Sequence, residues 1–228
     1  EEDFVYGHLL RILGPLLRPG ARILDYGCGD GGVAFFAVQR GCTGLGVDVS
    51  PHAIARAQAY AEASGLADRV KFRVFDCGQG ETLGLFDVVW AIEVIEHLPD
   101  DRAFLEWLAR QLRPGGTCLL STRLADEPLH RLRRRLAGRD WVDEGVGHLR
   151  RYEVAGLTRL VEGVGLAVGE VATAEGVVRN FCYVHRLGHL LWGRLSRWAW
   201  GRRAVARLDR WSLRWLEPAQ LIIVATKR

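Results

Sequence analysis

The sequence predicts a single α/β domain, residues 1–228, built on a doubly wound and mostly parallel sheet. Two observations support this fold class: strand-like and helix-like patterns alternate from residue 21 to residue 122, and a glycine-rich turn follows the first strand. Alternation of this kind places each helix as a crossover between parallel strands. In such sheets ligands bind at the carboxyl ends of the strands, so we expect the functional residues there.

Short apolar runs predict the strands, and longer segments with helical periodicity predict the helices between them. The clearest helix start is Ser50-Pro51, where serine can cap the helix and proline fits its first turn. Two helices are expected to stop at Pro-Gly signals, at residues 18–20 and 113–116. The expected strands are residues 21–26, 43–49, 70–75, 86–91 and 117–122, and the expected helices are residues 4–17, 33–40, 51–64 and 100–112.

Beyond residue 122 the pattern is less regular. Residues 123–147 are basic and irregular, and residues 179–216 predict a helical insertion. We expect insertions at 123–147 and 179–217 to cover and select the substrate. The remaining expected elements are a helix at residues 152–163 and strands at residues 166–172 and 219–225.

The composition argues against several classes of protein. Hydrophobic residues make up 49% of the chain and charged residues 25%, which is ordinary for a soluble globular domain. A net charge of +4 is too small to indicate nucleic acid, and five cysteines without a CxxC pair do not suggest a zinc ribbon or a disulfide framework. The start, Glu1 to Asp3, does not resemble a secretory signal, and charged residues interrupt the apolar stretch 181–200. The expected location is the cytoplasm.

The glycine-rich segment, residues 25–31, marks the expected ligand site. It fits the pattern DxGxGxG, and with Gly32 it also fits GxGxxG, the dinucleotide fingerprint. The segment alone therefore leaves open S-adenosylmethionine, a nicotinamide cofactor, or a plain tight turn. Asp48, at the end of the second strand, suits a ribose diol in either cofactor. Asp76, at the end of the third strand, adds an acceptor suited to an adenine amino group.

The wider pattern resembles the class I S-adenosylmethionine-dependent methyltransferases. The matching pieces are ILDYGCGDGG, GVDVSPHAI, FDCG, FDVVWAIEVIEHLPD and LRPGG, in the family's order and spacing. The resemblance implies a Rossmann-like sheet of seven strands whose last strand, residues 221–226, runs antiparallel. The asparagine-proline-proline-aromatic motif typical of amino methylation of DNA or protein glutamine is absent.

The same resemblance implies the role of each cofactor residue. Asp25 and the backbone of Gly27 and Gly29 should hold the methionine end, and Asp48 should bind the ribose. Asp76 and Cys77 should border the adenine, whereas Ala91 and Ile92 should line the sulfonium. The full set of expected cofactor residues is Asp25, Tyr26, Gly27, Cys28, Gly29, Asp48, Val49, Asp76, Cys77, Ala91 and Ile92.

An acidic and histidine-rich cluster follows the fourth strand. Glu93, Glu96 and His97 lie where this family brings the methyl acceptor to the cofactor, and His148 comes later. Three interpretations are open: residues that only shape the pocket, a catalytic group of Glu93 with His97 or His148 as general base, or a divalent metal site (Mg, Mn or Zn) formed by all four. The ExxEH spacing is similar to that of small-RNA 2′-O-methyltransferases and ubiquinone-biosynthesis O-methyltransferases.

Arginine and tryptophan recur together in the second insertion. On a helix, Arg203, Arg207, Arg210 and Arg214 would share one face, and Val205, Leu208 and Trp215 would fall on another. Such a segment suits the headgroup region of an anionic membrane, which would make 179–217 a peripheral membrane contact. The alternative is a helical cap with solvated arginines. The stretch 181–200 is too apolar for a phosphate track, which argues against nucleic acid.

Together these patterns predict an S-adenosylmethionine-dependent methyltransferase that O-methylates a small-molecule or lipid-linked acceptor. Three alternatives remain: an RNA 2′-O-methyltransferase, a non-catalytic S-adenosylmethionine-binding module, and a nicotinamide-dependent oxidoreductase.

Overall fold

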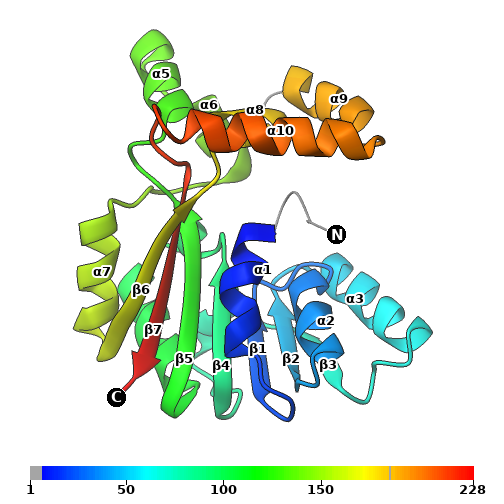
Figure 1. Ribbon diagram of the computed structural model, residues 1–228. Coiled ribbons are helices and arrows are strands. Elements are labelled where there is room, and N and C mark those ends of the chain that lie inside the picture. Colours follow the sequence, from blue (N-terminus) through cyan, green and yellow to red (C-terminus); the bar gives the residue numbers. More distant parts are fainter. Residues whose placement is uncertain (1–6, 185) are drawn as a thin grey trace.

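A computed structural model describes residues 7–184 and 186–228, and its centre is one seven-stranded sheet (Figure 1). The strand order is β3-β2-β1-β4-β5-β7-β6, and β7 runs antiparallel to both of its neighbours. The predicted parallel sheet with a reversed last strand is therefore confirmed. The strands are β1 (Arg22–Tyr26), β2 (Thr43–Asp48), β3 (Val70–Val74), β4 (Phe86–Ile92), β5 (Leu112–Arg123), β6 (Leu166–Ala174) and β7 (Gln220–Lys227).

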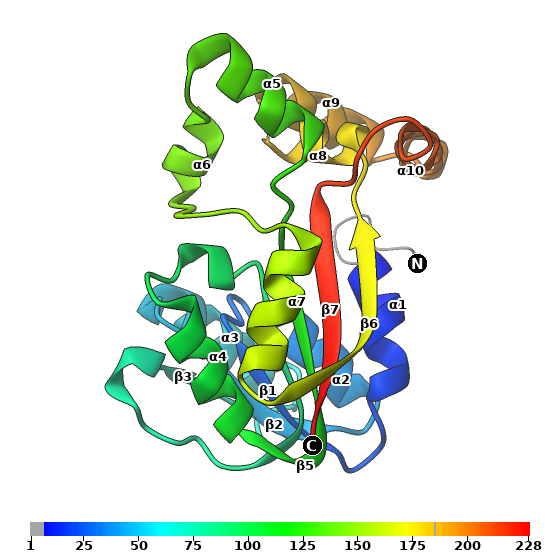
Figure 2. The same ribbon diagram turned by 90° about the vertical axis from the view of Figure 1, so that its left-hand side faces the viewer.

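Helices cover both faces of this sheet, as a doubly wound fold requires (Figure 2). One hydrophobic core joins the sheet to α1, α2 and α3, and a second joins the opposite face to α4 and α7. Because side chains alternate along a strand, each central strand serves both cores: Leu24 belongs to one and Ile23 to the other. These helices are α1 (Gly7–Leu13), α2 (Gly32–Gln39), α3 (Pro51–Ala63), α4 (Asp101–Arg110) and α7 (Val154–Gly163).

The helix start predicted at Ser50-Pro51 is confirmed. The Ser50 hydroxyl accepts a hydrogen bond from the Ala53 N–H at 3.3 Å, and Pro51 occupies the first helical position, where no N–H is needed. The same capping device opens α4, where the Asp100 carboxylate accepts from the Ala103 N–H. The start of α3 matters for function because it directly follows Asp48.

Several expected boundaries were wrong. The first helix ends at Leu13 and tightens into a 3-10 turn, Gly14–Leu16, at Pro15, and its expected residues 4–6 lie outside the described part. Residues 113–116 do not separate a helix from a strand: Leu112 already pairs with Phe86, and the Pro-Gly-Gly segment bulges before Thr117 pairs with Val88. Tyr152 belongs to an isolated bridge with Leu124 rather than to α7.

Residues 123–147, expected to be irregular, contain two further helices. These are α5 (Pro128–Ala137) and α6 (Trp141–Val146), and each begins at an acidic cap, Glu127 or Asp140. The capping carboxylates are almost fully buried and form ion pairs with arginine. The arginines that made the segment look irregular in sequence therefore stabilise the starts of these helices.

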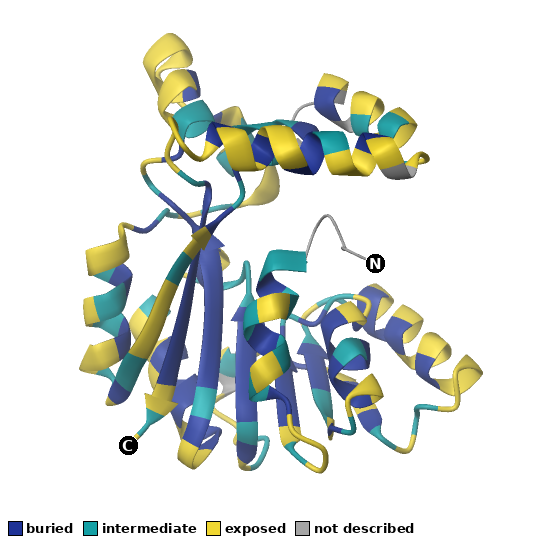
Figure 3. Ribbon diagram, in the orientation of Figure 1, coloured by how far each residue is buried: buried dark blue, intermediate teal, exposed yellow. Residues whose placement is uncertain are grey.

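Residues 179–216, expected to be helical, form α8 (Val177–Val184), α9 (Arg186–Leu195) and α10 (Ala199–Ser212). With α5 and α6 they make a cap beyond the carboxyl ends of the strands (Figures 1 and 2). Much of the cap surface is exposed, in contrast to the buried sheet (Figure 3). Its small core contains Cys182 and Val205. Within the described ranges, no helix combines the length and apolarity needed to cross a bilayer.

Candidate functional site

The glycine-rich turn after β1 forms the floor of the site. The backbone N–H groups of Gly27 and Cys28 both donate to the Val47 carbonyl of β2, which draws the turn across the sheet edge. Gly27 has a φ of 75°, and a Cβ there would lie 2.4 Å from Val94 Cγ2, so neither its conformation nor its surroundings accept a side chain. Gly29, with a φ of 51°, has open space on that side.

Asp48, at the end of β2, holds this turn from the other side. One carboxylate oxygen accepts from the Gly29 N–H at 2.9 Å, and the other accepts from the Ser50 N–H at 2.9 Å. An ionised carboxylate offers about four acceptor positions, so two remain for hydroxyl groups of a ligand. The arrangement is compatible with the expected ribose contact.

A pocket of about 440 Å³ opens over the glycine turn. It is lined by five residues of the expected cofactor set and by three that were not in that set, two from the glycine run and one directly after it. The expected ones are Asp25, Gly27, Cys28, Gly29 and Ile92, and the additional ones are Asp30, Gly32 and Val33. Another hollow, of about 460 Å³, lies at the opposite end of the sheet, and it is lined by Asp87, Arg113 and the turn at residues 114–116 rather than by any expected cofactor residue.

The other expected cofactor residues lie outside the lining of this pocket. Tyr26 and Ala91 are buried in the core, but the Tyr26 hydroxyl accepts a hydrogen bond from the Cys77 N–H at 3.3 Å. Asp76 caps the short turn at Cys77–Gln79 by accepting from the Gly78 N–H. Val49 is exposed directly after Asp48. Tyr26 therefore supports the segment expected to border an adenine, rather than contacting a ligand itself.

Asp25 is the most unusual group in the pocket. Its side chain is 3% exposed, and burial raises its pKa to about 7, although the Trp90 indole and the Ala34 backbone act in the opposite direction. Trp90 lies in register with Asp25 on β4, yet in the described part of the chain neither Asp25 Oδ2 nor Trp90 Nε1 has a well-formed hydrogen bond. A buried carboxylate without a partner favours a cationic ligand.

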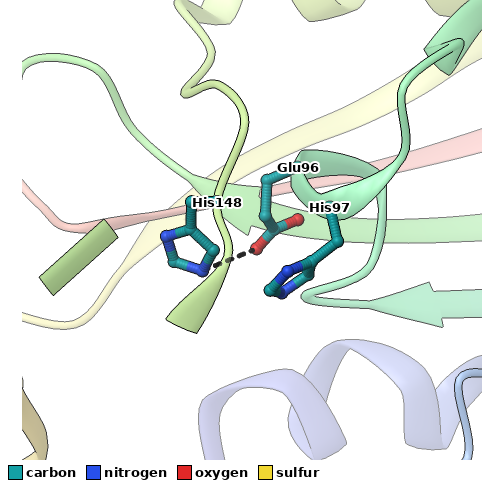
Figure 4. A group of neighbouring side chains, drawn as sticks. All are labelled: Glu96, His97 and His148. Atoms are coloured by element: carbon teal, nitrogen blue, oxygen red, sulfur yellow. Dashed lines mark ion pairs between the residues drawn. The ribbon is translucent and has the colours of Figure 1, made fainter. Parts of the chain in front are cut away.

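Three of the four residues of the acidic and histidine-rich cluster come together. Glu96, His97 and His148 each place one potential ligand atom within 4.8 Å of the other two (Figure 4). Glu96 is fully buried: one oxygen accepts from the Thr122 hydroxyl at 2.9 Å, while Oε1 has no hydrogen-bond partner and lies 4.0 Å from His148 Nε2. Burial, assisted by the nearby Glu93 charge, raises the pKa of Glu96 well above its usual range.

The ring of each histidine is held by a contact at its Nδ1 atom. His148 Nδ1 lies 2.8 Å from an Asp143 carboxylate oxygen, and His97 Nδ1 lies 3.2 Å from the Gly147 carbonyl. Because these oxygens only accept, each Nδ1 is the donor, and in the neutral imidazole each Nε2 then carries the lone pair that could bind a cation. The Leu149 N–H donates to the Glu96 backbone carbonyl. This bond joins the loop that carries His148 to the turn that carries Glu96 and His97.

Glu93 is not part of this three-residue group. Its carboxylate accepts from the Ser121 hydroxyl at 3.0 Å and from the Gln220 amide at 3.1 Å, and it lies 3.7 Å from the Arg123 guanidinium. Glu93 also has a positive φ of 54°, which is rare for a residue with a side chain. The structure thus places Glu93 beside the group, as the partner of a buried arginine.

A second group with metal-ligand residue types lies in the cap, formed by His130, Asp140 and Asp143. Two guanidinium groups already occupy its carboxylates: Arg133 binds Asp140 at 2.6 Å, and Arg151 binds Asp143 at 2.7 Å. Burial alone would raise the pKa of Asp143, but the hydrogen bonds from His148 and Arg151 together hold it far below its usual value. The group is therefore an ion-pair network, and sequence reasoning missed Asp143 because no local motif marks it.

Comparison with known proteins identifies the family. A family model described as a methyltransferase domain matches residues 4–171. A ubiquinone biosynthesis O-methyltransferase from Azorhizobium caulinodans is 39% identical over 121 residues, which is 51% of this chain and 45% of that protein. The chloroplastic tocopherol O-methyltransferase of Arabidopsis thaliana is 37% identical over 103 residues, which is 44% of this chain and 30% of that protein.

The chain thus spans less than half the length of these relatives. A solved structure of geranyl diphosphate methyltransferase in complex with SAM matches 97% of this chain and 83% of its own with a TM-score of 0.67. At 21% identity this likeness concerns the fold.

Proposed function

Because the chain belongs to the methyltransferase-domain family, we propose that it transfers the methyl group of S-adenosylmethionine to an oxygen atom of a small-molecule acceptor. The observation that carries the proposal is the pocket over the glycine turn, where a bare backbone meets the unpartnered Asp25 carboxylate. The names of the relatives support an oxygen acceptor.

Each expected cofactor residue then has a task. Asp25 pairs with the amino group of the methionine end, and Gly27 and Gly29 let that end approach the backbone. The two free acceptor positions of Asp48 bind the ribose hydroxyls. The adenine lies between Val49 and the Asp76-Cys77 segment, which Tyr26 supports from behind. Ile92, with Ala91 beneath it, faces the sulfonium.

We also propose that Glu96, His97 and His148 hold a divalent cation. The fit rests on three features of the structure: the orphaned Glu96 Oε1, the two free Nε2 lone pairs, and the closeness of the three side chains. One carboxylate with two imidazoles suits zinc or manganese better than magnesium. A cation bound there would make an acceptor hydroxyl more acidic and thus a better nucleophile.

Without a cation, the same geometry offers a general base. His97 is exposed at the surface, and partial desolvation of its ring, together with the His148 ring, lowers its pKa, so it is neutral near pH 7 and can accept a proton. In this version Glu93, still partly exposed and neutralised by Arg123, orients the acceptor. Methyl transfer needs alignment above all, so either version is compatible with the fold.

The acceptor is proposed to be apolar or lipid-linked. The cap that lies over the carboxyl edge of the sheet carries a concentration of exposed tryptophan and leucine, and it includes residues 179–217. An enzyme with such a cap would work as a peripheral protein on the cytoplasmic side of a membrane.

The test combines binding and turnover. Calorimetry with S-adenosylmethionine, with NAD and with Mn²⁺ or Zn²⁺ separates the cofactor and metal proposals from the oxidoreductase alternative. Transfer of labelled methyl groups is then measured on phenols with and without an apolar tail and on short RNAs. We expect binding of S-adenosylmethionine and methylation of tailed phenols. Methylation of RNA 2′-hydroxyls alone would favour the second candidate, to which the three-residue group also points. Tight binding without turnover would favour a binding module.

A further inference from the structure

Exposed apolar side chains are concentrated in one part of the chain. In a folded domain such side chains are normally scattered, and a contiguous set marks an interaction surface. Here the set falls on α9, α10 and the turns that follow them. Its members are Leu187, Leu190, Leu191, Trp198, Trp200, Leu208, Trp211, Leu213, Trp215 and Leu216.

The apolar residues of α10 that are not buried include a row along one face. Trp200, Ala204, Leu208 and Trp211 follow one another at spacings of four, four and three, so they share one face of the helix. Trp200 and Trp211 are 63% and 59% exposed, and Trp215, one turn beyond the helix, is 75% exposed. This row, which we call the tryptophan row, has no partner among the described residues that would remove it from solvent.

A different face of α10 is used for packing. Gly201, Val205, Asp209 and Ser212 are buried, and they also follow one another at helical spacing. Val205 packs with Cys182 of α8, so the expected grouping of Val205 with Leu208 and Trp215 on one face was wrong. The helix is therefore docked on the cap by one face and presents the tryptophan row on another.

A row of arginines lies beside the tryptophan row. Arg203, Arg207, Arg210 and Arg214 recur at spacings of four, three and four, and all four are exposed. From residue 177 to residue 216 the acidic residue is Asp209, which is buried and therefore neutralises none of them at the surface. The exposed charge of α10 is thus positive, with Glu217 as the exposed acidic residue directly after Leu216, and the helix is complementary to an anionic partner.

We propose that α10 docks on a bilayer containing anionic lipids, with the tryptophan row at the boundary of the acyl chains and the arginine row on the lipid phosphates. An exposed apolar row flanked by arginines, on a helix too short to span the membrane, is what binding in the plane of the interface requires. A water-soluble acidic protein would use the arginines but would leave the large apolar area unexplained.

The docked helix is fixed to the rest of the enzyme. The Asp209 carboxylate accepts from the backbone N–H groups of Gly176 and Arg179, at the start of α8. A Cβ at Gly176 would lie 2.4 Å from the Ser212 hydroxyl, so the helix touches the backbone there. Because β6 leads directly into this junction, docking of α10 would hold the sheet, and the cofactor pocket at the same end of it, at the membrane surface. This inference rests on the proposed function in one respect: docking at the membrane would bring the enzyme to a lipid-borne acceptor.

The experiment measures partition of the full chain onto vesicles of neutral phosphatidylcholine, with and without about one third phosphatidylglycerol. We expect binding to the anionic vesicles that weakens with salt. The variant Arg203→Gln/Arg207→Gln/Arg210→Gln should bind them on the order of 100-fold more weakly, since each arginine near an anionic surface contributes roughly a factor of five. The variant Trp200→Ser/Trp211→Ser/Trp215→Ser should lose binding to the anionic vesicles.

Matched controls have the same change elsewhere. Arg18→Gln/Arg110→Gln/Arg159→Gln removes three exposed arginines outside the cap and should keep at least about a third of the wild-type affinity. Leu85→Ser removes an exposed apolar side chain outside the cap and should bind as the wild type does. Circular dichroism and thermal unfolding, measured on every variant, show that each is folded.

Three results would overturn the proposal: no binding to anionic vesicles, equal weakening by the cap and control arginine variants, or a wild-type dimer that the tryptophan variant converts to a monomer. The outcome is separable from that of the proposed function. Vesicle binding is measured without turnover and without cofactor, whereas the proposed function is tested by binding of S-adenosylmethionine and by methyl transfer in the wild type.

Discussion

The buried Asp25 carboxylate is expected to lower the folding stability of the ligand-free protein and to raise its affinity for the cationic ligand. Replacing Asp25 tests both effects. In Asp25→Asn the side chain keeps its shape and its capacity to accept from Trp90, but it can no longer ionise. We expect the variant to be more stable than the wild type at alkaline pH and to lose affinity for S-adenosylmethionine, whose amino group is cationic.

The magnitude follows from the pKa. Burial raises the pKa of Asp25 from 3.8 to about 7, and each pKa unit corresponds to roughly 1.4 kcal/mol, so ionisation costs at most about 4 kcal/mol of folding free energy. The sign follows from proton binding: between these two values the folded state holds a proton that the unfolded state has released, so stability falls as pH rises through this range. Above about pH 7 the penalty is complete and constant.

The assay is urea unfolding of both proteins without ligand at pH 5 and pH 8.5. The stability advantage of the variant should grow by about 2–3 kcal/mol between these values. Taking the difference between the two proteins cancels other titrating groups, including Glu96. Affinity of the wild type for S-adenosylmethionine should increase as pH rises toward 7 and then level off. An advantage that does not change with pH, or a variant that binds the cofactor as tightly as the wild type, would refute this account of Asp25.

Three further predictions concern the rest of the site. Glu96→Gln should abolish binding of Mn²⁺ or Zn²⁺, measured by calorimetry, and should leave binding of S-adenosylmethionine unchanged. Undiminished metal binding would show that the cation binds at another site. Asp143→Asn should weaken metal binding by roughly 10–100-fold because it releases the hydrogen bond that orients His148, whereas Glu144→Gln, an exposed neighbour on α6, should not. Gly27→Ala should lower stability by about 1–3 kcal/mol and impair cofactor binding, because of its φ and the contact with Val94; a variant of wild-type stability would contradict the structure.

The sheet and the position of the glycine turn were predictable because their signals are local. The glycine turn, the carboxylates at strand ends and the Ser50-Pro51 cap each depend on neighbouring residues in the sequence. The structure has the seven-stranded sheet that these signals implied. Residues 128–146 were not recognised as helices because their caps, Glu127 and Asp140, share Arg133 of α5 and also bind Arg151, which only the tertiary fold brings to them.

The three-residue group was predictable in part. The ExxEH spacing and the later histidine named Glu96, His97 and His148, which the fold does bring together. The spacing could not show that Glu93, on the same short segment, turns toward Arg123, since that depends on a positive φ and on strands β5 and β7. Likewise, helical periodicity separated the faces of α10 but could not tell which one packs, and so it misplaced Val205.

The position of β7 has a consequence for biosynthesis. This strand is made last among the strands but lies between β5 and β6, both of which precede it in the chain. While the ribosome is still translating residues 220–227, β5 lacks one neighbour and β6 has none in the sheet. The cap helices precede β7 in the chain and leave the ribosome earlier. They therefore cannot reach their final position on the sheet until β7 has inserted between β5 and β6.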